Sequence, residues 1–322
     1  MSESGWRRLT RASVFALRRA LISLATVLVA LMLASFLLVH LVPGDPAVRV
    51  AGLDATPQDI ANVRHALGLD RPLVVQFARY VGNVARLDFG KSFVTNEPVV
   101  RVIADRLPKT LELAATAMLA VMMLSVPLGM TVAAITRDDR NRGFELVFTA
   151  ITATMSALPN FLSATFLAFA FAVWLRWLPA GGGERWDAVI LPAAAIGLRP
   201  MADLARIVRV ETLGALAQDY ALTARGKRLP WRLIYLRHIL PNVLTGALTI
   251  GGLLFAGLIG GTVVVENVFA WPGLGTALVQ AILARDYPVV QGITLLLGLA
   301  VITVNTTVDT VLVLVDPRSL PR

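Results

Sequence analysis

Residues 219–242 read DYALTARGKRLPWRLIYLRHILPN, a basic stretch that is rich in small side chains. It lies between two strongly apolar segments, one ending near Val208 and the other starting near Val243. A connector flanked in this way must lie in water at one face of a membrane. Its position predicts a chain built from membrane-spanning helices around an exposed connector.

The first half of this connector has the features of a short helix. We expect Asp219 as its N-cap and about two helical turns that stop before Pro230. Another protein's backbone could approach the small side chains closely, namely Ala221, Thr223, Ala224 and Gly226. Two interpretations stay open, a docking element for a soluble partner and an ordinary positively charged loop that fixes topology.

Composition indicates a polytopic membrane protein. The chain has 322 residues, of which 56% are hydrophobic and 16% charged, and its mean hydropathy is +0.70. It has no cysteine, which excludes disulfides and thiolate metal sites. Its three histidines are scattered, so no metal site is expected.

Apolar segments predict an all-α integral membrane protein with six transmembrane helices. The expected spans are 20–42, 110–135, 144–175, 188–210, 243–265 and 289–315. The first follows five arginines and is too long for a signal peptide's apolar region, so we interpret it as an uncleaved signal-anchor. Breaks of regular helix are expected inside spans at Pro127, Pro159 and Pro192.

A folded insertion outside the bilayer is expected between the first two spans, at 43–108. Thr56 is its clearest N-cap, with Pro57 at the first helical position and Gly68 ending the helix. A second, irregular outer stretch is expected at 266–288.

The remaining boundaries follow from these spans. The transmembrane domain takes 109–315 and contains the connector at 211–241, and the two ends are 1–19 and 316–322.

Charge distribution predicts which side each segment faces. Segments 1–20, 136–145, 199–241 and 316–322 together hold 18 Lys and Arg against 8 Asp and Glu. Segment 43–112 is nearly neutral, with 9 basic and 8 acidic residues. Because short loops rich in Lys and Arg stay in the cytoplasm, both termini and the connector are expected there. This asymmetry accounts for the net charge of +9, so nucleic-acid binding is not needed to explain it.

Motifs for nucleotide binding and catalysis are missing. Gly90-Lys91-Ser92 resembles the tail of a P-loop, but Ala85 stands where the motif needs glycine, so we interpret the tripeptide as a turn. The chain has no Gly-x-Ser-x-Gly elbow and no His-Glu-x-x-His helix. Transport against a gradient would therefore need energy from a partner.

Charged and amide side chains within spans are the other candidates, because each is costly in lipid. Arg199, Asp203 and Arg206 share one helical face, with Asp203 between two cations. This face is either an ion-pair stripe or the lining of a pathway's inner mouth. Asn305 and Asp309 form an i, i+4 pair that either packs helices or lines the pathway.

Motifs along nearly the whole chain resemble one family. They are HLVPGDP at 40–46, LGLDRP at 67–72, LDFGKS at 87–92, RLPKTLEL at 106–113, SALP at 156–159, VENVFAWPGLG at 265–275, RDYPVVQG at 285–292 and VDPR at 315–318. In this order they are similar to the inner-membrane permease subunit of ABC importers for peptides and nickel, of the first-permease type. The resemblance implies a type I ABC importer permease fold.

The resemblance also implies that 219–241 is the family's EAA-type loop, whose coupling helix fits a groove of an ATPase subunit. The coupling residues it implies are Asp219, Tyr220, Ala221, Thr223, Ala224, Arg225, Gly226, Lys227 and Arg228. Arg228 departs from the pattern because it stands where relatives have the glycine that ends the helix. The helix here is expected to end differently or to fit the ATPase through charge.

The resemblance further implies a multi-pass, non-catalytic subunit of a prokaryotic plasma membrane importer. Its implied partners are a second permease, two cytoplasmic ATPases that bind ATP and Mg, and an outer binding protein that the cap at 43–108 and 266–288 would receive. The expected substrates are di- or oligopeptides, with nickel, haem or glutathione as alternatives. A stand-alone secondary transporter and a membrane enzyme remain as rival classes.

Overall fold

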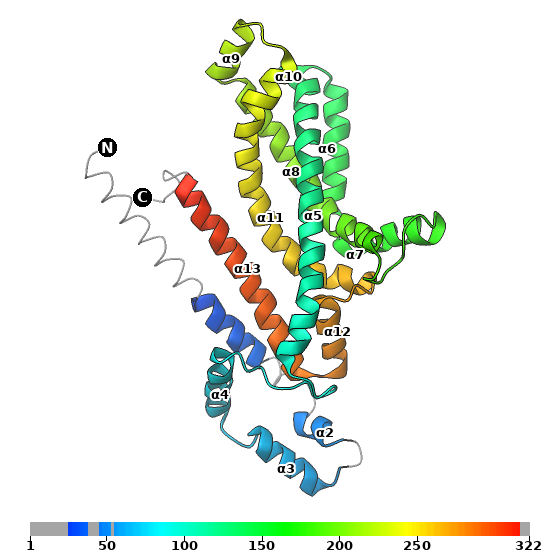
Figure 1. Cartoon of the computed structure of the whole chain (residues 1–322), viewed down its shortest axis with the longest axis vertical. Helices are drawn as coiled ribbons and strands as arrows, with labels where there is room; N and C mark the ends of the chain where they lie inside the picture. The colour runs from blue at the N-terminus through cyan, green and yellow to red at the C-terminus, as the bar shows by residue number, and fades with distance from the viewer. Residues whose placement is uncertain (1–24, 38–44, 53–54, 316–322) are drawn as a thin grey trace, which may run out of the picture. The chain divides into compact units, whose positions relative to one another are not determined.

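The computed structural model of the chain describes residues 25–37, 45–52 and 55–315 (Figure 1). Its regular elements in these ranges are helices, with one isolated β-bridge between Lys91 and Pro98. The chain divides into two compact units. Unit 1 comprises 1–108 and 273–306, and unit 2 comprises 109–272 and 307–322.

Four helical stretches among the described residues are long and apolar enough to cross a membrane. They are Val99–Thr136, Trp186–Leu216, Trp231–Val268 and Tyr287–Val308, and the bent pair Arg142–Ala157 with Asn160–Trp174 makes a fifth if it counts as one span. Of the expected first span at 20–42, the structure describes the apolar helix Ala25–Leu37, and the rest lies outside the described residues.

After the helix Ala25–Leu37, unit 1 contains three short helices, α2 (Pro46–Ala51), α3 (Pro57–Leu67) and α4 (Leu73–Ala85). The expected N-terminus of α3 is confirmed by a capping box. Thr56 accepts a hydrogen bond from the backbone N–H of Asp59, whose carboxylate accepts one from the N–H of Thr56. Gly68 ends α3 as expected, at a φ of +68°.

Asp45 joins α2 to α3. Its carboxylate caps α2 by accepting from the N–H of Ala47 at 2.9 Å, and it also pairs with the guanidinium of Arg64 on α3. The hydrogen bond from Arg64 holds the pKa of Asp45 below its ordinary value. One carboxylate therefore orders the start of one helix and the position of the next.

The tripeptide Gly90-Lys91-Ser92 precedes a turn at 93–95 and is not itself the turn that was expected, because Lys91 forms the β-bridge to Pro98. Its serine has a structural role. The buried hydroxyl of Ser92 donates to the buried carboxylate of Asp286 and accepts from the N–H of Thr95 at 2.9 Å. The N–H of Phe93 donates to the second oxygen of Asp286 at 3.0 Å. This turn is thereby fixed to the start of helix α13 (Tyr287–Val315).

The expectation of an irregular stretch at 266–288 was wrong for its second half. Residues Leu274–Ala284 form helix α12, which ends at Arg285 in the left-handed conformation with a φ of +55°. Leu274, Val99 and Ile293 are buried together in the core of unit 1. Helix α12 is therefore packed on the first turns of helix α5 (Val99–Thr136) and on α13.

Helix α5 is longer than expected. It begins at Val99, ten residues before the expected domain boundary at 109, and runs through Pro127 without a break. Helix α8 (Ile190–Leu216) likewise contains Pro192, close to its start, and Pro200. The prediction that Pro127 and Pro192 break the helix was therefore wrong.

Pro159 does interrupt its span. Helix α6 (Arg142–Ala157) ends before it, and α7 (Asn160–Leu167) with the π-helical η2 (Ala168–Trp174) follows at an angle of 102°. Proline lacks the N–H that a continuing helix needs, which accounts for the break at this position.

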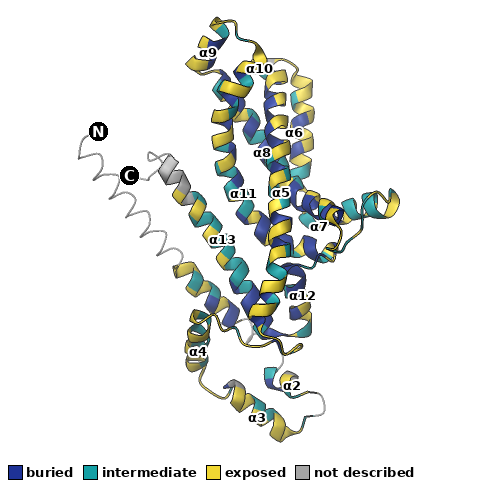
Figure 2. Ribbon diagram, in the orientation of Figure 1, coloured by how far each residue is buried: buried dark blue, intermediate teal, exposed yellow. Residues whose placement is uncertain are grey.

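Helix α8 is the central element of unit 2 and packs against α6, α7 and α11 (Leu240–Val268). Most of its length is buried (Figure 2). Small residues allow close approach, since a Cβ at Gly129 of α5 would lie 2.6 Å from the carbonyl oxygen of Ala205 on α8. Such contacts are typical of helix packing in membranes.

Candidate functional site

The connector folds as a short helix followed by the start of a long one. Helix α9 covers Asp219–Gly226, and after Pro230 come α10 (Trp231–Leu233), the π-helical η4 (Ile234–Ile239) and α11. The two expected turns of α9 are confirmed. The expected N-cap was wrong, because Gln218 is the extended capping residue and Asp219 lies in the first turn. A carboxylate in that turn still interacts favourably with the helix dipole.

Arg228 provides the end of α9. It has a φ of +55°, the left-handed conformation that glycine adopts at least cost. The N–H of Arg228 donates to the carbonyl of Arg225 at 2.8 Å, and the N–H of Leu229 donates to that of Ala224 at 3.3 Å. These two bonds form a Schellman motif. The helix therefore ends with the geometry that glycine would give, although the residue is arginine.

The burial pattern corrects the expected role of two small residues. Ala221 and Ala224 face inward and are buried with Leu216, Ile234 and Ile239 of the same chain. They anchor α9 to its own bundle, so in this chain they leave no surface for a partner. The exposed face of α9 consists of Asp219, Tyr220, Leu222, Thr223 and Gly226, followed by Lys227 and Arg228.

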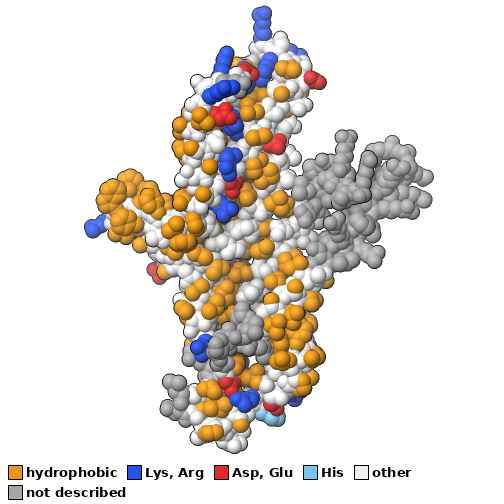
Figure 3. Space-filling model, turned by 180° about the vertical axis from the view of Figure 1, so that it is seen from behind, with side chains coloured by type: hydrophobic (Ala, Val, Ile, Leu, Met, Phe, Trp, Pro, Cys, Tyr) orange, Lys and Arg blue, Asp and Glu red, His pale blue; other side chains and the backbone are white. Residues whose placement is uncertain are grey.

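Polar contacts fasten α9 further. The guanidinium of Arg225 donates to the carbonyl of Leu216 at 3.2 Å and lies 5.2 Å from the ring centre of Trp231. The side-chain amide of Asn242 donates to the hydroxyl of Tyr220 at 3.2 Å. These contacts connect α9 to the end of α8 and the start of α11. Lys and Arg side chains gather at this end of unit 2 (Figure 3).

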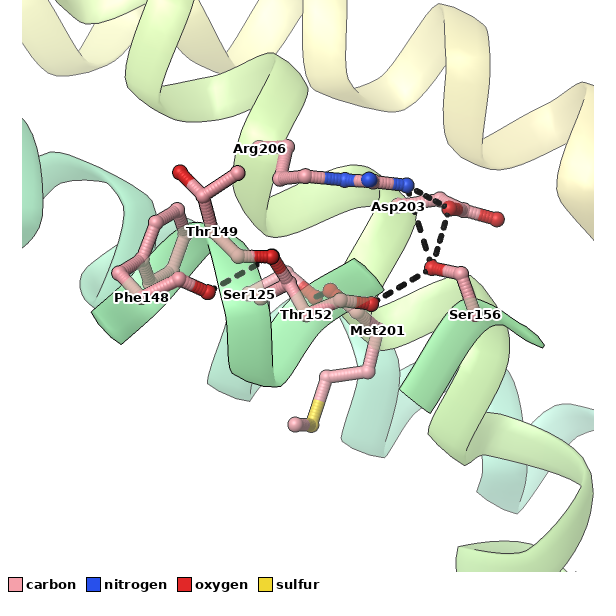
Figure 4. Close-up of polar contacts among 8 residues, drawn as sticks. All are labelled: Ser125, Phe148, Thr149, Thr152, Ser156, Met201, Asp203 and Arg206. Carbon is pink, nitrogen blue, oxygen red and sulfur yellow. Dashed lines mark hydrogen bonds and ion pairs between the residues drawn. The ribbon is translucent and has the colours of Figure 1, made fainter. Parts of the chain in front are cut away.

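Inside the bundle, Asp203 and Arg206 of α8 meet Ser156 of α6 (Figure 4). One oxygen of Asp203 lies 2.5 Å from a guanidinium nitrogen of Arg206 and 2.7 Å from the Ser156 hydroxyl. Arg206 also donates to that hydroxyl at 3.1 Å. The three side chains are partly buried. They meet beside the last turn of α6, just before the bend between α6 and α7.

Arg199 does not join this cluster. It is exposed and pairs with no residue in the described part of the chain. The expectation that Asp203 lies between two cations is therefore corrected, because its ion pair is with the residue three positions later. The sequence motifs included Ser156 only as the first residue of SALP at 156–159, and its hydroxyl completes the cluster.

The ion pair of Arg209 was not predicted. Its guanidinium lies 2.7 Å from Glu145 of α6 and donates to the hydroxyl of Thr136 on α5 at 3.2 Å. The signal was available, since Arg209 follows Arg206 on a predicted span and charges there are costly unless paired. Arg209 connects three helices near the base of the connector.

Asn305 and Asp309 lie four residues apart on α13, as expected. Asn305 is partly buried, and the side chain of Asp309 lies outside the described residues. Among the residues that the structure describes, no group of three or more His, Cys, Asp or Glu could hold a metal ion.

The all-helical fold with its membrane-spanning helices agrees with the sequence comparisons. Residues 125–320 match the family described as the binding-protein-dependent transport system inner membrane component, and residues 13–114 match the N-terminal membrane component of such systems. The first match covers more than half of the chain, so the chain belongs to this family. It is the membrane permease of a binding-protein-dependent ABC importer.

Individual relatives are similar over most of their length. A putative peptide transport system permease protein from Brucella suis biovar 1 is 38% identical over 88% of this chain and 92% of its own. The glutathione transport system permease protein GsiC from Salmonella paratyphi A is 39% identical over 94% of this chain and 97% of its own. A crystal structure of an amino acid ABC transporter with histidines matches 68% of this chain and 94% of its own, with a TM-score of 0.48 and 17% identity.

Proposed function

We propose that α9 is the surface gripped by a cytoplasmic ATPase subunit of the importer. The observation that carries this proposal is the division of α9 into two faces. Ala221 and Ala224 fix it to its own bundle, while Leu222 and Thr223 are exposed, and Tyr220 is exposed although its hydroxyl accepts a hydrogen bond from Asn242. Leu222 and Tyr220 therefore offer an apolar surface on α9 that a partner can cover.

The contacts of α9 suit it to act as a lever. Movement of its outer face would be passed to α8 through the bond between Arg225 and Leu216, and to α11 through the bond between Asn242 and Tyr220. ATP-driven closure of the ATPases would open the transport cavity outward, and hydrolysis would reset it. Such coupling requires that the ATPase contact differ between the two states.

The proposed assembly follows from the charge distribution and the family. Both termini and α9 face the cytoplasm, because the excess of Lys and Arg lies on that side of a plasma membrane. A second permease completes the pathway, two ATPases bind ATP and Mg, and an outer binding protein delivers the substrate. This chain has no catalytic role of its own. The family of binding-protein-dependent permeases supports these partners.

We propose short peptides as the substrate class. Relatives at 38% and 39% identity are named for peptide and glutathione transport, and glutathione is itself a small peptide derivative. The test is uptake of labelled di-, tri- and oligopeptides and of glutathione into vesicles that contain the assembled importer with its binding protein. Uptake of none of them, with uptake of another solute, would contradict this assignment.

The sharpest test of ATPase docking is Gly226→Trp. Gly226 is exposed on α9 and nothing lies within 4 Å of an added Cβ, so a larger side chain would start in open space on the outer face. We expect normal membrane insertion and loss of ATP-dependent uptake. Gly143→Trp is the matched control, because Gly143 is also exposed and open but lies on α6. Normal uptake by the Gly226 variant would refute docking at α9.

Ala224→Trp is expected to destabilise the chain itself, because Ala224 is buried, and it therefore does not report docking. A flux measurement separates the proposal from a stand-alone transporter. The chain purified alone in vesicles should give no flux, whereas a stand-alone transporter would give it.

We also propose that helices α2 to α4 form an outer cap that receives the binding protein. A deletion that tests this must end before Val99, because α5 begins there. Removing 55–86 should abolish stimulation of the ATPase by the loaded binding protein. Stimulation that survives the deletion would assign the receptor elsewhere.

A further inference from the structure

A groove of about 750 Å³ opens between the end of α5 and the segment formed by α10 and η4. Its wall is apolar and includes Val126 and Met130 of α5 and Leu236 and Leu240 of the facing segment. The hydroxyl of Thr131, which also lines the wall, donates to the backbone carbonyl of Pro127 at 2.6 Å. This part of the groove therefore suits a hydrocarbon chain.

The rim of the same groove is cationic. Arg137 and Arg140 follow the end of α5, and Arg232 lies in α10. Arg137 donates to Asp138 at 2.8 Å, which partly neutralises it. Arg140 and Arg232 are exposed and pair with no residue that the structure describes. The positive charge of the rim would therefore attract an anionic group.

Two aromatic side chains lie between the wall and the rim. Trp231 and Tyr235 line the groove, and the guanidinium of Arg137 lies 4.5 Å from the ring centre of Trp231. The expected end of the span at 135 falls between the wall residues Val126 and Met130 and the rim residues Arg137 and Arg140, so we take this level as the membrane boundary. Tryptophan and tyrosine are enriched at that boundary.

We propose that this groove binds an anionic phospholipid, with its phosphate at the arginines and an acyl chain along the wall. The order of apolar wall, aromatic level and cationic rim along the helices matches the order of groups in such a lipid. Val126 and Met130 lie within the expected span 110–135, so a soluble partner could reach the rim but not this part of the apolar wall. The inference needs only that the chain spans a bilayer, and it is independent of ATPase docking.

Binding there would act on the base of the connector. The guanidinium of Arg137, which lines the groove, lies 4.5 Å from the ring centre of Trp231, and the guanidinium of Arg225 on α9 lies 5.2 Å from the same ring centre. A lipid that restrains Arg137 and Trp231 would therefore also restrain the ring that Arg225 of α9 contacts.

Quenching of tryptophan fluorescence by brominated lipids tests the proposal in the assembled importer in nanodiscs. Brominated phosphatidylglycerol should quench more strongly than brominated phosphatidylcholine, and Trp231→Phe should remove this difference. The combined variant Arg137→Gln, Arg140→Gln and Arg232→Gln should also remove it, with roughly fivefold lower relative affinity for each arginine lost. Excess inorganic phosphate should leave the difference unchanged, because a free anion lacks the acyl chain.

The matched control removes the same charge from the same connector. Lys227, Arg228 and Arg237 are exposed but do not line the groove, and their combined change to Gln should preserve the preference. Equal loss in both triple variants would indicate general attraction and overturn the proposal. So would equal quenching by the two lipids, or no contribution from Trp231, which would mean that another subunit covers the groove.

Discussion

The hydroxyl of Ser92 donates a hydrogen bond to the carboxylate of Asp286, a residue 194 positions later in the chain. Both side chains are buried. Ser92→Ala should therefore lower the stability of unit 1 by roughly 1–3 kcal/mol, because a buried carboxylate loses a donor. Thermal unfolding in detergent measures this loss.

Thr154→Ala is the control for this change, since the Thr154 hydroxyl is exposed and bonds only within its own helix. A smaller effect of Ser92→Ala than of Thr154→Ala would contradict the assigned role. It would also leave the tripeptide Gly90-Lys91-Ser92 without an assigned structural role.

Arg228→Gly should stabilise the end of α9. Arginine at a φ of +55° costs roughly 1 kcal/mol relative to glycine. Slower hydrogen exchange of the α9 amides is the expected result. Arg228→Asn tolerates the same backbone conformation and serves as a second uncharged variant. If α9 exchanges faster in both variants, the guanidinium itself stabilises the helix end.

Gly129→Ala should loosen the contact between α5 and α8. The added Cβ would lie 2.6 Å from a backbone oxygen and 2.7 Å from the side chain of Val208, so the helices must move apart. The expected loss is roughly 1–3 kcal/mol of stability. Gly257→Ala in α11 meets no atom within 4 Å and should be neutral or gain up to about 1 kcal/mol. Equal unfolding temperatures for the two variants would argue against close packing at Gly129.

A double-mutant cycle between Asp203 and Arg206 distinguishes an ion pair from a pathway lining. We expect a coupling energy of roughly 0.5–3 kcal/mol for Asp203→Asn with Arg206→Gln, because the two groups are in contact. Arg199→Gln should show almost no coupling to Asp203, since Arg199 is exposed and unpaired among the described residues. Transport that changes while stability stays constant would favour the lining.

Acid should release α2 and α3 from one another. The pKa of Asp45 is lowered in the folded chain, chiefly by the hydrogen bond from Arg64. A lowered pKa means that its contribution is complete at neutral pH and is lost as the pH falls through the folded-state value. The protection of the amides in both helices, measured against the exchange rate of an unfolded chain at the same pH, should fall in that acidic range. In Asp45→Asn this protection should already be reduced at neutral pH.

Local rules predicted the parts of the chain that depend on neighbours in sequence. Thr56, Pro57 and Gly68 bound α3 because capping involves residues at most a few positions apart. The local rule for proline predicted the break at Pro159 correctly, but the same rule was wrong at Pro127 and Pro192, where the helix continues. Asp219 was misplaced by one position because Gln218 adopts the extended conformation of the N-cap, and side-chain preference alone favours aspartate.

Contacts between distant segments were out of reach. The direction in which Ala221 and Ala224 face depends on Ile234 and Leu216, and small side chains are equally compatible with an inner and an outer face. Likewise, the choice of Asp203 between Arg199 and Arg206 depends on Ser156, which comes from another helix. A single sequence contains no signal for that contact.

The continuity of α5 has a practical consequence for anyone who wants to study the two units separately. The division after Pro108 falls inside this helix, which runs from Val99 to Thr136. A cut at that point would leave four backbone donors and four acceptors without helical partners. A cut in the loop 179–184, between η2 and η3, would interrupt no helix, but this loop lies inside unit 2, so each co-expressed half would keep only part of that unit.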